Sequence, residues 1–252
     1  PTDKVVWGDV ELFAQAIQSL PSQVLAITGA NGKTTVTTLL GECCVAAGLQ
    51  TVVAGNIGLA VLDALTQVEH NMAQGLPAPD VFVLELSSFQ LETQYSLQAT
   101  AATVLNISED HMDRYADLND YAAAKQRIFA PNTQRVLNRE DAYCVAMQQE
   151  KQTVWFGLDA PNTDFSYGVI EKDGRLALCL GKNMLLYADE LHMTGLHNVA
   201  NVLAVLALLQ GIQVDIAPIL STIKAFKTLA HRVEWVKTIH GVDFFDDSKG
   251  TN

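Results

Sequence analysis

Short apolar runs alternate with amphipathic stretches along most of the chain. Runs typical of buried strands occupy residues 24–28, 51–54, 81–86, 102–107, 135–138 and 153–156, and helical patterns occupy 34–47, 58–68 and 118–129. A near-continuous apolar run such as 81–86 is typical of a strand that is buried on both faces of a parallel sheet. The alternation therefore predicts an α/β fold with a doubly wound, mostly parallel sheet.

The pattern changes near residue 165. Three short strand candidates follow at 165–170, 175–180 and 184–187, with turn signals at 172–174 and 181–183, and they predict a small antiparallel β insert. Helices are expected again at 198–209 and 216–226, and strands at 233–238 and 242–246 form a predicted hairpin around His240 and Gly241. A further helix is expected at 10–20, before the first strand.

Composition limits the classes of partner. A chain of 252 residues can bury a full core in one large domain. Its net charge of −12 argues against a nucleic-acid partner, because a polyanion would be repelled. The four cysteines show no metal-binding spacing and are interpreted as reduced thiols of a cytoplasmic protein. The longest apolar stretch, 199–209, is too short to span a bilayer, so no membrane partner is expected.

The strand at 24–28 ends in a glycine loop, and a helix follows at once. Glycines let backbone N–H groups turn toward phosphate oxygens, and the helix adds the positive end of its dipole. Lys33 would reach the terminal phosphates, and the Thr34 hydroxyl would contact Mg²⁺. Ile27 stands where the common P-loop spacing has a glycine. The candidate nucleotide-binding residues of this loop are Gly29, Asn31, Gly32, Lys33, Thr34 and Thr35.

Two further candidates follow buried strands. Glu85 ends the run 81–86, where a Mg²⁺ near the phosphate loop would find a hard oxygen ligand, although an ordinary strand-end carboxylate is the alternative. His111 lies in the polar segment 106–114 and could bind a metal or a substrate phosphate, or be a surface-loop histidine.

Lys125 sits among alanines in the predicted helix 118–129, which begins after Asp117 as a possible N-cap. Apolar surroundings disfavour the charged amine, and a neutral amine can add CO₂ to give a carbamate, a carboxylate-like metal ligand. A helix lysine that extends to solvent is the alternative. Asn198 and Asn201 share a helix face, and one can cap the helix while the other contacts a base or ribose.

Polar residues near the end of the sequence are ambiguous on their own. Arg232 precedes a predicted strand and could stabilise phosphoryl charge, or be part of an ordinary polar loop. Asp247 and Lys249 lie in a polar segment that resembles the middle of a motif.

Together these strings resemble the Mur ligase family of ATP-dependent amide-forming enzymes, over essentially the whole chain. The motifs that carry the resemblance are 28–34, 55–58, Glu85 with 84–92, 106–115, Lys125, 197–201, 231–232 and 247–249. The resemblance implies a parent of three domains. Residues 1–23 would be a lead-in from an N-terminal UDP-binding domain, 24–252 a central ATP-binding domain, and an amino-acid-binding domain would follow.

The resemblance also implies roles for individual residues. Lys33, Glu85, His111 and Lys125 would be catalytic, with ATP and two Mg²⁺ ions as the bound species. Thr34 and Glu85 would hold one ion, and His111 with a carbamylated Lys125 would hold the second. Asn56, Ser87, Gln90 and His111 would face the muramoyl substrate. Asn198 and Asn201 would face the adenine nucleotide, and Arg232, Asp247 and Lys249 would close around ATP.

Within the family, the strings 8–13 and 87–92 are similar to members that add D-glutamate to UDP-N-acetylmuramoyl-L-alanine in peptidoglycan synthesis, and a monomer is expected. A folate-polyglutamating ligase shares the fold and the ATP chemistry, but the string 87–92 argues against it. A simple ATPase switch would lack the Lys125 carbamate. A nucleotide-binding module without activity of its own is the third alternative, and the fragment alone is expected to be inactive.

Overall fold

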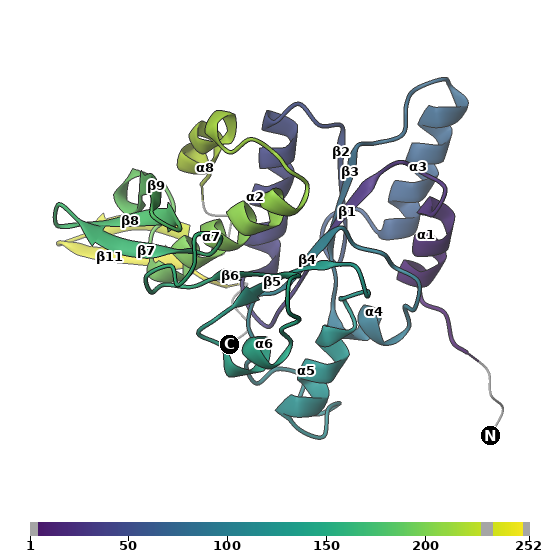
Figure 1. Cartoon of the computed structure of the whole chain (residues 1–252), viewed down its shortest axis with the longest axis horizontal. Coiled ribbons are helices and arrows are strands. Elements are labelled where there is room, and N and C mark those ends of the chain that lie inside the picture. Colours follow the sequence, from purple (N-terminus) through teal and green to yellow (C-terminus); the bar gives the residue numbers. More distant parts are fainter. Residues whose placement is uncertain (1–4, 228–233, 249–252) are drawn as a thin grey trace.

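The computed structural model describes residues 5–227 and 234–248. At its centre lies a six-stranded sheet in which every neighbouring pair is parallel (Figure 1). Its strands are β1 (Gln23–Thr28), β2 (Thr51–Gly55), β3 (Val81–Glu85), β4 (Ala101–Val104), β5 (Gln134–Asn138) and β6 (Thr153–Phe156), in the spatial order β2-β3-β1-β4-β5-β6. The predicted parallel sheet is therefore confirmed.

Helices cover both faces of this sheet, which confirms the predicted doubly wound arrangement. Leu25 and Ile27 of β1 belong to the apolar cluster on one face, and Val24 and Ala26 belong to the cluster on the other. The first face is covered by α2 (Lys33–Ala46), α7 (Leu196–Gly211), η2 (Ala217–Ile219) and α8 (Leu220–Ala225). The second is covered by α1 (Asp9–Ile17), α3 (Val61–Ala73), α4 (Ser88–Glu92), α5 (Leu118–Gln126) and α6 (Ala142–Ala146).

Two small antiparallel sheets complete the fold. The predicted insert forms a three-stranded sheet of β7 (Tyr167–Lys172), β8 (Arg175–Leu180) and β9 (Asn183–Tyr187), followed by η1 (Ala188–Glu190). The predicted hairpin is also present, as β10 (Glu234–Ile239) and β11 (Val242–Asp246), although residue 233 lies outside the described residues. Within the described part of the chain, no helix has the length and apolar character needed to cross a membrane.

Helix α1 packs into the same core as the parallel sheet. The ring of Phe13 meets that of Phe82 of β3 edge to face, with 5.2 Å between centroids. The buried carboxylate of Glu11 accepts hydrogen bonds from the backbone N–H groups of Tyr95 and Ser96, at 2.6 and 2.9 Å. The segment before β1 is therefore fixed to the sheet by apolar burial and by a satisfied buried charge.

Several element boundaries differ from the predictions. The strand predicted at 102–107 ends at Val104. Leu105 N–H still donates to the Thr28 carbonyl of the neighbouring β1, but Ile107 N–H donates to the Asp141 carboxylate, which belongs to no strand of the sheet. The helix predicted at 58–68 begins at Val61 and runs to Ala73, and the one predicted at 118–129 ends at Gln126. The helix at 216–226 starts as a 3₁₀ turn, and the five-residue helices α4 and α6 were not predicted because they are too short to show a helical period.

Candidate functional site: a nucleotide-binding site at the strand ends

The loop between β1 and α2 has the backbone geometry of a phosphate cradle. Gly32 is the N-cap of α2 and adopts the left-handed conformation, with φ at 83°. Its Cα also lies against α7, because a Cβ there would stand 2.6 Å from Oδ1 of Asn201. Glycine is thus required at this position both by conformation and by space. The N–H groups of the first turn of α2 face the loop, where an anion is favoured.

Asn106, which follows β4, pins the loop from the side. Its Oδ1 accepts from the backbone N–H of Asn31 at 2.8 Å, and its Nδ2 donates to the carbonyl of Asn31 at 3.1 Å. The Asn31 side chain in turn donates to the Ser108 hydroxyl at 3.3 Å. These bonds fix the loop conformation before any ligand binds, so that little ordering is needed on binding.

Lys33 folds over the loop that it follows. Its Nζ donates to the carbonyls of Gly29 and Ala30 at 2.9 and 2.8 Å. The ammonium therefore lies at the N-terminus of α2, where it can exchange its bonds to these carbonyls for bonds to phosphate oxygens.

Glu85 lies beside the loop at the end of β3. It pairs in register with Ile27 of β1 and with Gly55 of β2, and a Cβ on Gly55 would stand 2.1 Å from the Glu85 carbonyl. The side chain is 2% exposed, and Oε1 accepts from Nδ2 of Asn56 at 3.2 Å. Oε2 is buried and has no hydrogen-bond partner among the described residues.

This orphaned oxygen fits a magnesium ligand. Mg²⁺ is commonly bound by one or two protein oxygens with phosphate oxygens and water completing the shell. Thr34 and Glu85 are the residues that carry such oxygens next to the loop, and their role as ligands stays a prediction. Among the described residues no group of three or more His, Cys, Asp or Glu side chains is placed to hold a metal.

Lys125 of α5 reaches the same loop from the other face of the sheet. The side chain is 1% exposed, and its Nζ donates to the carbonyl of Gly29 at 3.0 Å and to the Thr28 hydroxyl at 3.3 Å. Burial, reinforced by the neighbouring Lys33 ammonium, lowers the pKa of Lys125 to about 7, although the carboxylates of Asp110 and Glu85 oppose this shift. The sequence-based expectation of an amine with access to its neutral form is consistent with this geometry.

His111 lies farther toward solvent than the other candidates. Its side chain is 45% exposed, its Nε2 is 3.5 Å from the Asp110 carboxylate, and its ring centroid is 4.9 Å from that of Phe89. Its backbone φ of 57° places it in the left-handed region, which histidine adopts more readily than most non-glycine residues. Its side-chain contacts are with Asp110 and Phe89, and its role as a metal ligand stays a prediction.

The other three residues predicted to face the substrate, after His111, have structural contacts of their own. Asn56 holds Glu85, as described above. Ser87 is the N-cap of α4 and forms a capping box with Gln90, whose Nε2 also donates to Asp9 of α1 at 3.2 Å. These contacts orient the end of β3 relative to α1, and contact with substrate stays a prediction.

A cavity of about 350 Å³ extends from the phosphate loop along the start of α7. Asn201 lines it, as predicted, and its Nδ2 donates to Oδ1 of Asn198 at 3.3 Å. Asn198 does not line the cavity, because its own Nδ2 donates to the Thr194 carbonyl at 2.8 Å. Neither asparagine caps α7, since the helix begins at Leu196 with Gly195 as its N-cap. Asn198 instead positions Asn201.

The cavity also contains residues that the sequence analysis did not assign to the nucleotide. Asn138 ends β5 and Phe156 ends β6, and both line the cavity. Leu105 and Asn106 line it as well, and so do His197 and Ala200 of α7. The position of Asn138 and Phe156 at the carboxyl ends of two predicted strands was a usable signal. Asp247 lies exposed directly after β11, whereas Arg232 and Lys249 lie outside the described residues.

Comparison with known proteins agrees with this geometry. A protein from Methylobacillus flagellatus named UDP-N-acetylmuramoylalanine--D-glutamate ligase is 55% identical over 248 residues, which are 98% of this chain and 52% of that protein. One of the same name from Thiobacillus denitrificans is 52% identical over 258 residues, 97% of this chain and 53% of that protein. The chain thus spans about half the length of the curated relatives that it matches.

Fold comparison and the family profile extend the similarity. Crystal structure I of MurF from Acinetobacter baumannii matches with a TM-score of 0.70 at 20% identity, over 94% of this chain and 53% of that one, which shows a shared fold. The profile of the Mur ligase middle domain matches residues 27–209. That match begins within β1, includes β2 to β6 in full and ends in α7, so it covers most of the chain. The chain therefore belongs to the Mur ligase family.

Proposed function

We propose that the chain is the nucleotide-binding part of an ATP-dependent ligase that joins D-glutamate to UDP-N-acetylmuramoyl-L-alanine. The observation that carries the proposal is the convergence of Lys33, Glu85 and Lys125 on one glycine loop at the strand ends. The two relatives named for D-glutamate ligation, at 55% and 52% identity, support this acceptor and amine over a folate substrate.

The proposed reaction has two steps. The acceptor's carboxylate attacks the γ-phosphate of ATP, which releases ADP and leaves an acyl phosphate. The amine of D-glutamate then attacks the acyl carbon, and inorganic phosphate leaves as the amide forms. Lys33 and the loop N–H groups stabilise the charge on the phosphates, and Thr34 and Glu85 hold a Mg²⁺ that neutralises more of it.

Lys125 is proposed to act as a carbamate. With a pKa of about 7, a large fraction of its amine is neutral near neutral pH, as addition to CO₂ requires. The neutral amine nitrogen would form a bond to the CO₂ carbon as one C=O π bond opens onto its oxygen, and the nitrogen would then lose a proton to water, which leaves an N-carboxylate. That carboxylate and His111 are proposed to hold a second Mg²⁺.

The carbamate can be tested in two ways. Carbon-13 NMR of the chain in labelled bicarbonate should show a carbamate signal that disappears in Lys125→Arg. In the full-length protein, Lys125→Ala should lose most ligation, and acetate at high concentration should restore part of it by occupying the vacated ligand position. Wild-type turnover in Lys125→Ala or Lys125→Arg would rule out a ligand role.

The remaining predicted residues are proposed to act around the same nucleotide. Asn56, Ser87, Gln90 and His111 would face the muramoyl substrate, since they lie at the ends of β2 and β3 and in the segment after β4. Asn201, held by Asn198, would contact the nucleoside. Arg232, Asp247 and Lys249 are proposed to close over ATP.

Calorimetric titration with Mg-ATP tests whether the chain binds the nucleotide, on which the rest of the proposal depends. The wild-type chain should bind the nucleotide, and Lys33→Ala should weaken binding strongly because a charge-assisted contact is lost. Lys224→Ala is the matched control, since it also removes a lysine but one that lies on α8, pairs with Glu190 and does not line the cavity at the loop. Equal affinity in Lys33→Ala and wild type would refute a phosphate site at this loop.

A further inference from the structure

One wall of the nucleotide cavity is built from the ends of two neighbouring strands. Asn138 ends β5 and Phe156 ends β6, and the two residues are register partners in the parallel sheet. Both line the cavity that starts at the phosphate loop, and Phe156 is 2% exposed. Their positions depend on how the chain is held where it leaves the sheet.

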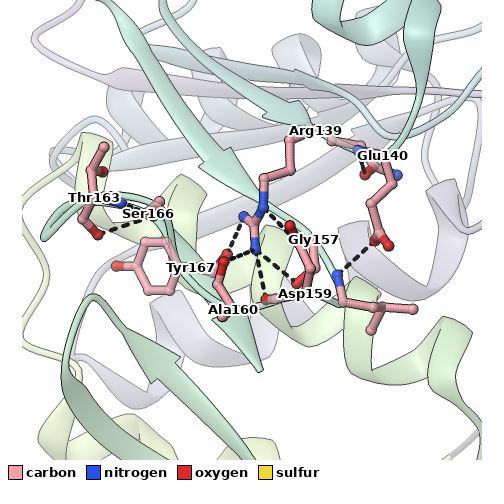
Figure 2. Close-up of polar contacts among 10 residues, drawn as sticks. Arg139, Glu140, Gly157, Asp159, Ala160, Thr163, Ser166 and Tyr167 are labelled. Atoms are coloured by element: carbon pink, nitrogen blue, oxygen red, sulfur yellow. Dashed lines mark hydrogen bonds and ion pairs between the residues drawn. The ribbon is translucent and has the colours of Figure 1, made fainter. Parts of the chain in front are cut away.

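The side chain of Arg139 holds the connection between β6 and β7 through hydrogen bonds to its backbone carbonyls (Figure 2). Its Nη1 donates to the Tyr167 carbonyl at 2.6 Å, and its Nη2 donates to the Asp159 carbonyl at 2.8 Å. Its Nε lies 2.5 Å from the Asp159 carboxylate, and longer bonds reach two more carbonyls of the same connection. Only 8% of this side chain is exposed. One guanidinium therefore ties the chain after β6 to the first residue of β7.

The surroundings of Arg139 are shaped to admit a guanidinium. Gly168 faces it from β7, where a Cβ would stand 2.6 Å from Nη2 and 2.4 Å from the Asp159 carbonyl. The backbone N–H of Arg139 donates to the Phe156 carbonyl at 3.0 Å, and Glu140 accepts from the N–H of Leu158 at 2.6 Å. Arginine is the side chain whose planar fork offers enough donors to satisfy these separate carbonyls at once.

We propose that Arg139 is a positioning residue for the nucleoside of bound ATP. It fixes the wall formed by Asn138 and Phe156 and does not itself touch the nucleotide. This inference rests on the proposed function, because it assumes that ATP phosphates occupy the loop. The phosphates have their own supports in Lys33 and the loop N–H groups. Removing Arg139 should therefore weaken nucleoside recognition and leave phosphate binding intact.

Titration with two ligands separates these contributions. The chain is titrated with Mg-ADP and, separately, with Mg-tripolyphosphate, which carries phosphates but no nucleoside. In Arg139→Gln the affinity for ADP should fall roughly ten- to hundredfold, the loss typical when a residue that supports a binding shell is removed. Tripolyphosphate affinity should change by less than about twofold, which also reports that the loop is still folded. Gly168→Ala, which crowds the same guanidinium from β7, should show the same selective loss.

Arg175→Ala is the matched control. Arg175 lies on β8 of the same small sheet and pairs with Asp189, but 43% of its side chain is exposed and it contacts no residue of the cavity wall. Neither affinity should change in this variant, because an exposed ion pair contributes little.

Three results would overturn the inference. Unchanged ADP affinity in Arg139→Gln would show that Asn138 and Phe156 keep their positions without the hydrogen bonds of Arg139. Equal losses for both ligands would show that Arg139 supports the loop or the whole fold. Wild-type ADP affinity in Arg139→Lys would show that charge alone suffices, since an ammonium donates from a single nitrogen and lacks the two separate nitrogens from which Arg139 reaches the Tyr167 and Asp159 carbonyls. A wild-type chain that binds neither ligand would instead refute the proposed function, and the inference with it.

Discussion

Replacing Gly32 by alanine should impair both stability and nucleotide binding, and Gly48→Ala provides its control. Both glycines adopt the left-handed conformation, with φ at 83° and 85°. A Cβ on Gly48 meets nothing within 4 Å, whereas one on Gly32 would stand 2.6 Å from Oδ1 of Asn201. The two variants therefore share the conformational penalty and differ only in the steric one.

The magnitudes follow from this difference. The left-handed conformation costs an alanine roughly 1–2 kcal/mol, and this is the whole expected loss for Gly48→Ala. Gly32→Ala adds a contact that is well inside the 3.4 Å at which ordinary contact begins. Asn201 is 9% exposed and bonded to Asn198, so it cannot move without strain, and overpacking of this kind costs about 1–3 kcal/mol more.

Urea unfolding followed by tryptophan fluorescence measures the first effect, and calorimetry with Mg-ADP measures the second. Gly32→Ala should bind ADP about tenfold more weakly, because displacement of Asn201 removes a contact worth a typical hydrogen bond. Gly48→Ala should bind ADP like the wild type. If the two variants lose equal stability and both keep wild-type affinity, the packing of Gly32 against Asn201 does not organise the loop.

Three further predictions concern titratable groups. Glu11→Gln should lower the unfolding free energy by about 1–3 kcal/mol, because buried donors lose a charged acceptor. Although burial opposes the shift, hydrogen bonds from Gln15, Tyr95 and Ser96 lower the pKa of Glu11 below its ordinary 4.5, so its stabilisation is present above pH 4.5 and is lost as the pH falls through the lower folded-state pKa. An acid-unfolding midpoint that is identical in the variant would contradict this. The pKa of Lys125 is lowered from its ordinary 10.5 to about 7 in the folded state, so the folded chain loses this proton at a lower pH than the unfolded chain does. The stability of the wild type relative to Lys125→Met should therefore increase as the pH rises from about 7 to 10.5. A pH-independent difference in urea titrations would argue against the shift. Burial raises the pKa of the Cys43 and Cys144 thiols and raises that of Cys44 to about 12, so a thiol-specific reagent should label none of them until the chain unfolds; rapid labelling of the native chain would contradict their burial.

The sequence predicted best where one local pattern determines the structure. The apolar runs at 24–28 and 81–86 are typical of buried strands, and the phosphate loop and Glu85 do lie at the ends of strands. The structure adds that these two strands are neighbours in the sheet. The alanines around Lys125 left open whether its amine is buried or extends to solvent, and the structure shows it buried against Thr28 and Gly29, far away in the sequence.

The sequence predicted less where distant segments meet. Asn138 and Phe156 line the cavity only because β5 and β6 end side by side beneath α7. The ring of carbonyls around Arg139 joins residues separated by 28 positions, and no local pattern reports such a contact. Ser87 and Gln90 were interpreted through family resemblance alone, and their capping box became visible only with the short helix α4.

The most direct test of the central claim is ADP release by the full-length protein that contains this chain. Sustained ADP release should require Mg-ATP, UDP-N-acetylmuramoyl-L-alanine and D-glutamate together, because without the amine the first step can form only one acyl phosphate and one ADP per protein molecule. Lys33→Ala should abolish ADP formation. ADP release that is equally fast without D-glutamate, or that requires a folate and L-glutamate instead, would contradict the account.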